Sequence, residues 1–310
     1  MKRFKNILFI ADRDEGIKGA LDRAIVVSQT NAARLTVMDV TPEAGLADTF
    51  RQTYAVDINV QIKQQRLDAL EAHLEPYTMA GIPVYTQVVT GIPFLEVVRA
   101  VLRNGHDLVM KVAENDTGLA PWLFGSTDMH LLRKCPCPVW IDHPDAAPAY
   151  QRLLAAVDPF GDEADDLQRL ILDLATSLAE REQATLDVLH AWELPGESTL
   201  ANGRGRIPRS ELDLLLEACE KSHRQALDAL LLPYGLSSAA GNVHLLKGQP
   251  AKIISAQATQ QRTDLIVMGT LGRFGIPGLF IGNTAEDVLR QSQTAVLAVK
   301  PRGFVSPVTG

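Results

Sequence analysis

Apolar and polar positions along the chain alternate between two patterns. Five short, continuously apolar runs in the first half predict buried strands, and between them apolar residues recur every three or four positions, as in amphipathic helices. The predicted strands cover residues 6–11, 34–40, 84–89, 107–111 and 138–141. The predicted helices cover residues 17–29, 60–77, 94–102 and 126–134. Strands that are apolar throughout and alternate with helices indicate an α/β fold, in which helices cover both faces of a parallel sheet.

The second half of the chain repeats this order. Strands are expected near 152–157, 185–191, 242–246, 264–268 and 295–299, and helices near 162–181, 209–232, 250–261 and 283–292. Three pairs of similar segments lie 157 positions apart, and they begin at Asp107 and Asp264, Thr90 and Lys247, and Gly125 and Gly282. A constant offset across separated segments indicates an internal repeat. We therefore expect two tandem domains, residues 1–143 and 150–303.

Three segments lie outside the repeated pattern. Residues 143–149 contain two prolines and small side chains, which is typical of a short, stiff linker. Residues 194–207 are rich in Gly and polar residues and show no period, so we expect a mobile loop there. Residues 304–310 are expected to fray.

Composition favours a folded globular chain. Apolar residues make up 46% and charged residues 22%, near the averages of soluble proteins, which excludes disorder along the whole chain. The net charge is −7 and neither half is basic, which argues against general nucleic-acid binding because phosphates require clustered Lys and Arg. No apolar run approaches the roughly 18–20 residues of a membrane span, and three cysteines make no disulfide framework. We expect a cytoplasmic protein.

A glycine pattern follows the fourth strand of the second repeat. Gly269, Gly272 and Gly282 have the spacing G-x2-G-x9-G, and a helix is expected to begin at Asn283. Helix N-termini attract anions, and glycines allow a ligand to approach the backbone. Asp158 ends the first strand, which we expect beside the fourth strand at the crevice where strand order reverses. Loop glycines that only serve turns, and an Asp158 that only caps a helix, are the structural alternatives.

These residues carry a family resemblance. The strand end LIVMGT at 265–270, the glycine spacing and the closing segment AVLAVK at 295–300 resemble the universal stress protein family, and the match spans nearly the whole chain twice. Two such domains in one chain resemble the tandem, E-type bacterial members. The resemblance implies two tandem, doubly wound, five-stranded parallel sheets with strand order 3-2-1-4-5, a Rossmann-like fold of the adenine-nucleotide alpha-hydrolase type. It also implies pairing between the domains through the last strand.

In some members of the family the crevice holds ATP or another adenine nucleotide with Mg²⁺. The resemblance places that site in the second repeat, at Asp158, Ala191, Gly269, Gly272, Gly282, Asn283 and Thr284. Arg273, beside the second glycine, is a further candidate phosphate partner, although a solvated loop arginine is an equal alternative. Asn283 departs from the family pattern, which has Ser or Thr directly after the third glycine.

The first repeat departs further from the nucleotide-binding pattern. Val112 and Asn115 replace the first two glycines, and Glu114 adds a negative charge where phosphates would lie. A carboxylate beside a phosphate is repulsive. We therefore expect no triphosphate in the first repeat, although Asp12 is retained.

Other features give weaker signals. The loops at 119–124 and 274–281 carry large apolar side chains, which indicate packing against another domain or chain, an apolar ligand or a protein partner. Cys135 and Cys137 enter a buried strand and are expected to act as small hydrophobes. His190 aligns with Asp39 at the end of the second strand, near the crevice. No P-loop, nucleophile elbow or paired-carboxylate motif is present.

Three functions follow as hypotheses. The first is a non-catalytic stress-response module that binds a nucleotide or another small ligand and meets protein partners. The second is a slow Mg-ATP hydrolase using the same crevice. The third is an apolar-ligand or lipid binder, or a protein scaffold without nucleotide. The two repeats can form a pseudo-dimer within one chain, and a homodimer is left open.

Overall fold

The structure is a computed structural model that describes residues 4–12, 17–43, 57–114, 126–160, 164–203, 206–270, 282–291 and 294–309. The chain divides into two compact units. The described residues of the first unit are those between 4 and 149 together with the closing strand and tail at 295–309. Those of the second unit lie between 150 and 294.

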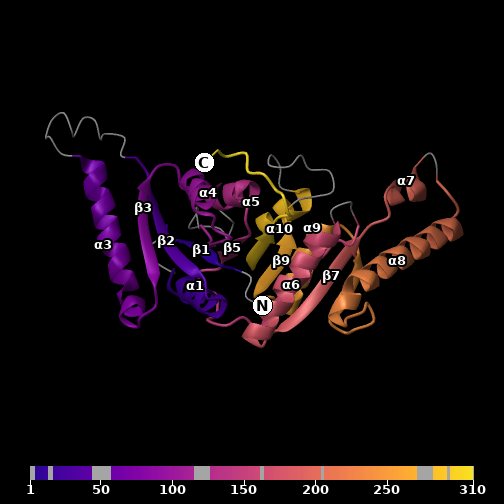
Figure 1. Cartoon of the computed structure of the whole chain (residues 1–310). Coiled ribbons are helices and arrows are strands. Elements are labelled where there is room, and N and C mark those ends of the chain that lie inside the picture. The colour runs from indigo at the N-terminus through magenta and orange to yellow at the C-terminus, as the bar shows by residue number, and fades with distance from the viewer. Residues whose placement is uncertain are drawn as a thin grey trace. The chain divides into compact units, whose positions relative to one another are not determined.

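The first unit follows the predicted alternation. Its strands are β1 (Asn6–Ile10), β2 (Arg34–Thr41), β3 (Val84–Thr90), β4 (Leu108–Val112) and β5 (Val139–Asp142). Its helices are α1 (Ile17–Asn31), α3 (Ile58–Met79), α4 (Pro93–Asn104) and α5 (Ser126–Lys134). In Figure 1 the part of this unit before residue 150 runs from indigo to magenta, with α3 alongside β3.

Strands β1 to β5 form a parallel sheet in the order β3-β2-β1-β4-β5. The expected order 3-2-1-4-5 is therefore confirmed. All five residues of β4 are buried, as are all but the first of β1, because helices cover both faces of the sheet. Strand order reverses between β1 and β4, and this places a crevice at their carboxyl ends.

The second unit repeats this plan with β6 (Arg152–Ala156), β7 (Thr185–Trp192), β8 (Val243–Lys247) and β9 (Leu265–Gly269) in the order β9-β6-β7-β8. Its helices are α6 (Ala164–Glu182), α7 (Glu197–Asn202), α8 (Arg209–Leu231), α9 (Pro250–Gln261) and α10 (Asn283–Gln291), and a short 3-10 helix, η1, covers Leu232–Tyr234. The register repeats as well: Asp39 pairs with Val88 in the first unit, and His190 pairs with Leu245 in the second. His190 is therefore the structural counterpart of Asp39, as predicted.

The closing strand of the second repeat, β10 (Ala295–Val299), belongs to the first unit. It pairs with β5 in antiparallel fashion, and Val296, Leu297 and Ala298 lie opposite Ile141, Trp140 and Val139. All five residues of β10 are buried. The expected pairing of the repeats through their last strands is confirmed, and it fits a pseudo-dimer within one chain.

Two expectations about the segments outside the repeats were wrong. Part of the predicted mobile loop forms α7, and Glu197 in its first turn pairs with Lys247 of β8 at 2.5 Å. The tail beyond β10 does not fray as a whole, because the Lys300 ammonium donates to the carbonyl of Leu132 and the Ser306 hydroxyl donates to that of Lys134 at 2.7 Å. The tail thus satisfies carbonyls at the C-terminus of α5, which have no partner within the helix.

The linker between the repeats is held by a buried arginine. Arg23 of α1 is buried and pairs with the buried Asp142 at the end of β5, at 2.9 Å. Its guanidinium also donates to the carbonyls of Ala147 and Pro148. A single arginine therefore fixes the end of the sheet and the start of the linker together.

Candidate functional site

The crevice of the second repeat lies beyond the carboxyl ends of β6 and β9. These strands are neighbours, and Ala156 lies opposite Met268. Asp158 and Gly269 follow these positions, so both candidates reach the same end of the sheet. Helix α10 begins at Asn283, as predicted, and the Gly282 amide donates to the Thr270 carbonyl at 2.7 Å. This bond brings Gly282, Asn283 and Thr284 to the end of β9.

Gly269 has a packing role of its own. A Cβ at this position would lie 3.1 Å from the Leu167 side chain of α6, which is closer than ordinary van der Waals contact. The glycine therefore lets α6 approach the end of β9. Gly272 and Arg273, the remaining candidates of the loop, lie outside the described residues.

Asp158 is positioned by its own turn. Its carboxylate accepts from the Phe160 amide at 3.3 Å, and its amide donates to the Gln168 side chain at 2.9 Å. Gln168 lies on α6 and is buried. These contacts orient Asp158 at the end of β6. A helix cap and a ligand contact would both require this orientation.

Beside Ala191, the candidate on the second strand, lies an aromatic cluster that the sequence analysis missed. His190 is buried; its Nδ1 lies 3.0 Å from the Val157 carbonyl and its Nε2 lies 2.8 Å from Nδ1 of His223. The rings of Phe160 and Trp192 lie 4.5 and 5.5 Å from that of His223, centroid to centroid. The cluster thus places four rings beside Ala191, at the carboxyl end of β7.

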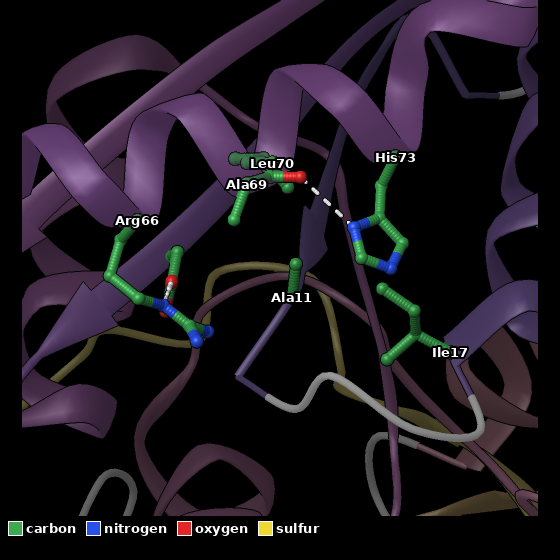
Figure 2. Close-up of a pocket in the computed structure, with 7 residues that line it drawn as sticks. Ala11, Ile17, Arg66, Ala69, Leu70 and His73 are labelled. Atoms are coloured by element: carbon green, nitrogen blue, oxygen red, sulfur yellow. Dashed lines mark hydrogen bonds and ion pairs between the residues drawn. The ribbon is translucent and has the colours of Figure 1, made fainter.

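The first repeat has a different contact at the same place. Arg66 of α3, 157 positions before His223, pairs with Asp39 at 2.6 Å. Figure 2 shows Arg66, Leu70 and His73 of α3 along one side of a small cavity that also touches Ala11, with Ile17 below the His73 ring. The cavity measures ≈ 10 Å³, which is about the room of one water molecule. The helix and its arginine therefore close this part of the first crevice.

The rest of the first crevice holds a buried charge cluster. The Lys111 ammonium of β4 is fully buried and lies 2.5 Å from Asp128, 3.1 Å from Asp12 and 3.9 Å from Glu114. Burial tends to lower the pKa of Lys111, but the three carboxylates outweigh it and raise this pKa above its ordinary value. Burial raises the pKa of Asp12 despite the nearby lysine. One ammonium thus lies close to three carboxylates. Because its pKa is raised, Asp12 takes up a proton more readily than an exposed aspartate.

A carboxylate of this cluster lies at the N-terminus of helix α5. The Glu114 carboxylate accepts from the Thr127 amide at 3.0 Å, at the first turn of the helix, and the Asp128 carboxylate accepts from the Glu114 amide at 2.9 Å. Helix N-termini are favourable places for negative charge. Glu114 therefore supplies negative charge at the N-terminus of α5, and the absence of a triphosphate in the first repeat stays a prediction.

The second repeat lacks the charged residues of this cluster. Its counterparts of Lys111, Glu114 and Asp128 are Met268, Leu271 and Ala285, while Asp158 corresponds to Asp12. The start of α10 consequently has no acidic side chain at the position of Glu114. Among the described residues, no group of three or more His, Cys, Asp or Glu could hold a metal ion.

No helix in the described parts of the chain combines the length and the apolar character that a membrane crossing requires.

Comparisons with known proteins agree with this geometry. The chain is 28% identical to Universal stress protein E of Escherichia coli K12 over 99% of its own length and 98% of that protein's. It is 25% identical to the Universal stress protein E homolog of Haemophilus influenzae, over 96% and 98% of the two lengths.

Solved structures share the fold. A functionally unknown protein from Pseudomonas aeruginosa superposes with a TM-score of 0.76 at 24% identity, covering 98% of this chain and 95% of that one. A universal stress protein from Archaeoglobus fulgidus gives 0.61 at 19% identity, covering 95% and 98%. The model of the universal stress protein family matches residues 3–143 and 149–300. With both repeats matched, the chain belongs to the universal stress protein family.

Proposed function

We propose that this chain is a cytoplasmic, non-catalytic stress-response module of two domains, residues 1–143 and 150–303, and that its second domain binds an adenine nucleotide. The phosphates would lie at Gly269, Gly272, Arg273, Gly282, Asn283 and Thr284. The base would lie between Asp158, Ala191 and the rings of Phe160 and His223. Binding would act by favouring one conformation that partner proteins recognise.

The observation that carries this proposal is the difference between the two crevices. In the first repeat, Glu114 caps the helix that follows the fourth strand, and Lys111 neutralises the carboxylates around it. In the second repeat the counterparts of Lys111, Glu114 and Asp128 are all apolar. The first turn of α10 carries Glu286, which pairs with Arg290 at 2.7 Å, but it has no acidic residue at the position of Glu114. Helix N-termini attract anions, which supports a phosphate site there.

Titration calorimetry with ATP, ADP and AMP tests the proposal. Asn283 is exposed at the start of α10, so Asn283→Asp preserves size and capping ability but adds a negative charge beside the phosphates. We expect this variant to weaken ATP binding about tenfold, which corresponds to about 1.4 kcal/mol. Ser126→Asp, the matched change at the exposed start of α5, is expected to leave ATP binding unchanged.

Three results would contradict the proposal. The absence of binding heat at millimolar ATP would exclude a nucleotide site of useful affinity. ATP binding that responds to Ser126→Asp and not to Asn283→Asp would place the site in the wrong repeat. Phosphate release that Asn283→Asp abolishes would favour the hydrolase over the non-catalytic module.

A further inference from the structure

Two cysteines lie side by side where the first repeat closes its sheet. Cys135 follows α5, Cys137 precedes β5, and each is followed by a proline. Their Sγ atoms lie 3.6 Å apart, and the two residues are 0% and 8% exposed. The third cysteine, Cys219 on α8, is half-buried in the second unit. The close pair differs from an ordinary buried cysteine because each thiol has a second thiol as its neighbour.

The backbone permits a bond between these sulfurs. Residues two apart in a chain have Cα atoms at most about 7 Å apart, and the chain bends at Pro136 and Cys137, which shortens that span. Disulfides form between Cα atoms separated by about 4.4–6.8 Å, with an S–S bond of about 2.05 Å. Closing the bond would bring the two Sγ atoms from 3.6 Å to about 2.05 Å.

A buried lysine lies near the pair. Lys300 is 5% exposed, and its ammonium donates to the carbonyls of Leu132 and Arg133 and lies 4.6 Å from the centre of the Phe304 ring. Burial lowers the pKa of Lys300 to about 8. Burial raises the pKa of Cys135, but the hydrogen bond from Cys137 and the charge of Lys300 outweigh it and lower this pKa overall. The hydrogen bond to Cys135, followed by burial, raises the pKa of Cys137. The hydrogen bond from Cys137 and the charge of Lys300 thus both favour a thiolate at Cys135.

We propose that Cys135 and Cys137 form a reversible disulfide when the folded protein meets hydrogen peroxide. The Cys135 thiolate attacks one peroxide oxygen, the O–O bond breaks, and the leaving hydroxide takes up the thiol proton as water. Cys135 is then a sulfenic acid. Cys137 attacks its sulfur, the S–S bond forms, the S–O bond breaks, and the leaving hydroxide with the Cys137 proton gives a second water. Two thiols are oxidised by two electrons, and one peroxide is reduced to two waters.

The site lies at the junction of the two repeats' closing strands. Cys137 is two residues before Val139, which pairs with Ala298 of β10, and Lys300 directly follows β10. A disulfide would fix the bend between α5 and β5 and remove the thiolate that the Lys300 charge stabilises. Oxidation of the two cysteines would therefore change the structure next to the pairing of β5 with β10.

Thiol counting tests the proposal on the full chain. The folded Cys219→Ser variant is treated with hydrogen peroxide, the peroxide is destroyed with catalase, and the protein is then unfolded without reductant. We expect the number of free thiols to fall from two to none, and peptide mass spectrometry to find residues 135 and 137 joined, with the loss of two hydrogens. Treatment with a dithiol reductant should restore both thiols.

A second variant identifies the intermediate. Cys137→Ser removes the resolving thiol, so peroxide should leave a sulfenic acid at Cys135 that dimedone traps, whereas Cys135→Ser should give far less trapped product. Two thiols that persist in the folded Cys219→Ser protein would overturn the proposal and identify the pair as inert core residues. Oxidation to sulfinic acids without a disulfide would overturn it as well.

Discussion

At the scale of single residues, the repeats differ in the buried charge cluster around Lys111, whose lysine, Glu114 and Asp128 are replaced by apolar residues in the second repeat. Replacing Lys111 with Met, its counterpart in the second repeat, leaves Asp12, Asp128 and Glu114 together without their ammonium. Breaking a buried ion pair from one side typically costs about 3–5 kcal/mol, because an uncompensated charge remains. We expect the Lys111→Met variant to lose stability of that order in denaturant unfolding.

The matched comparison is a triple variant. Adding Glu114→Leu and Asp128→Ala to Lys111→Met gives the first repeat the residues of the second. Replacing a whole buried charge cluster by apolar residues is often neutral or stabilising. We therefore expect the triple variant to recover most of the loss, and a triple variant as unstable as Lys111→Met alone would contradict this account of the cluster.

Candidate residues differed in how far the sequence could predict them. Asp158, Gly282 and Asn283 reach the same end of the sheet because each lies within two residues of the end or start of a regular element. Such positions are evident in a periodic sequence. The contact of His190 with His223 joins a strand end to a helix residue 33 positions away. No local pattern encodes that contact, although the repeat offset from Arg66 to His223 was a signal that could have found it.

At the scale of elements, each repeat turns from its third strand into the next helix through a glycine with a positive φ. Gly91 has φ +154°, Gly248 has φ +143°, and a Cβ would lie 2.8 Å from the Glu96 side chain or 3.0 Å from that of Ile253. L-residues rarely adopt this conformation, and a strained φ costs about 1–3 kcal/mol. We expect Gly91→Ala and Gly248→Ala each to lower stability by about that amount in thermal or denaturant unfolding.

Gly241 provides the control within the same chain. It has no positive φ, and a Cβ there would meet no atom within 4 Å. Gly241→Ala should therefore change the free energy of unfolding by less than about 0.5 kcal/mol. Equal losses at all three glycines would show that the turn conformation is not the cause.

Strands and helices were largely predictable because parallel strands are apolar throughout and the helices between them keep their period. The predictions were wrong in two segments whose local structure depends on tertiary contacts. Helix α7 lies in a segment without period and is tied to the sheet by the Glu197–Lys247 pair. The tail is ordered by Lys300 and Ser306 on the end of α5, more than 160 positions away in sequence.

At the scale of the whole molecule, strand order and the pairing of the last strands came from the family resemblance, since neither follows from periodicity. The structure adds that β10 shares a compact unit with the first repeat. Without β10, the buried strand β5 would expose unpaired backbone groups along an apolar edge. The first repeat is thus completed by a strand that the second repeat encodes.

This arrangement predicts the behaviour of the isolated first repeat. A fragment of residues 1–148 keeps β1 to β5 but lacks β10, and β5 pairs with β10 in antiparallel fashion. An antiparallel pair can be formed by two copies of the same strand related by a two-fold axis. We therefore expect the fragment to be a dimer through β5, with twice the chain mass in light scattering after size-exclusion chromatography. A chain that joins residues 1–148 to 295–309 through a flexible linker covers β5 with β10 and should no longer pair through β5. A monomeric fragment would show that the exposed edge of β5 does not determine association.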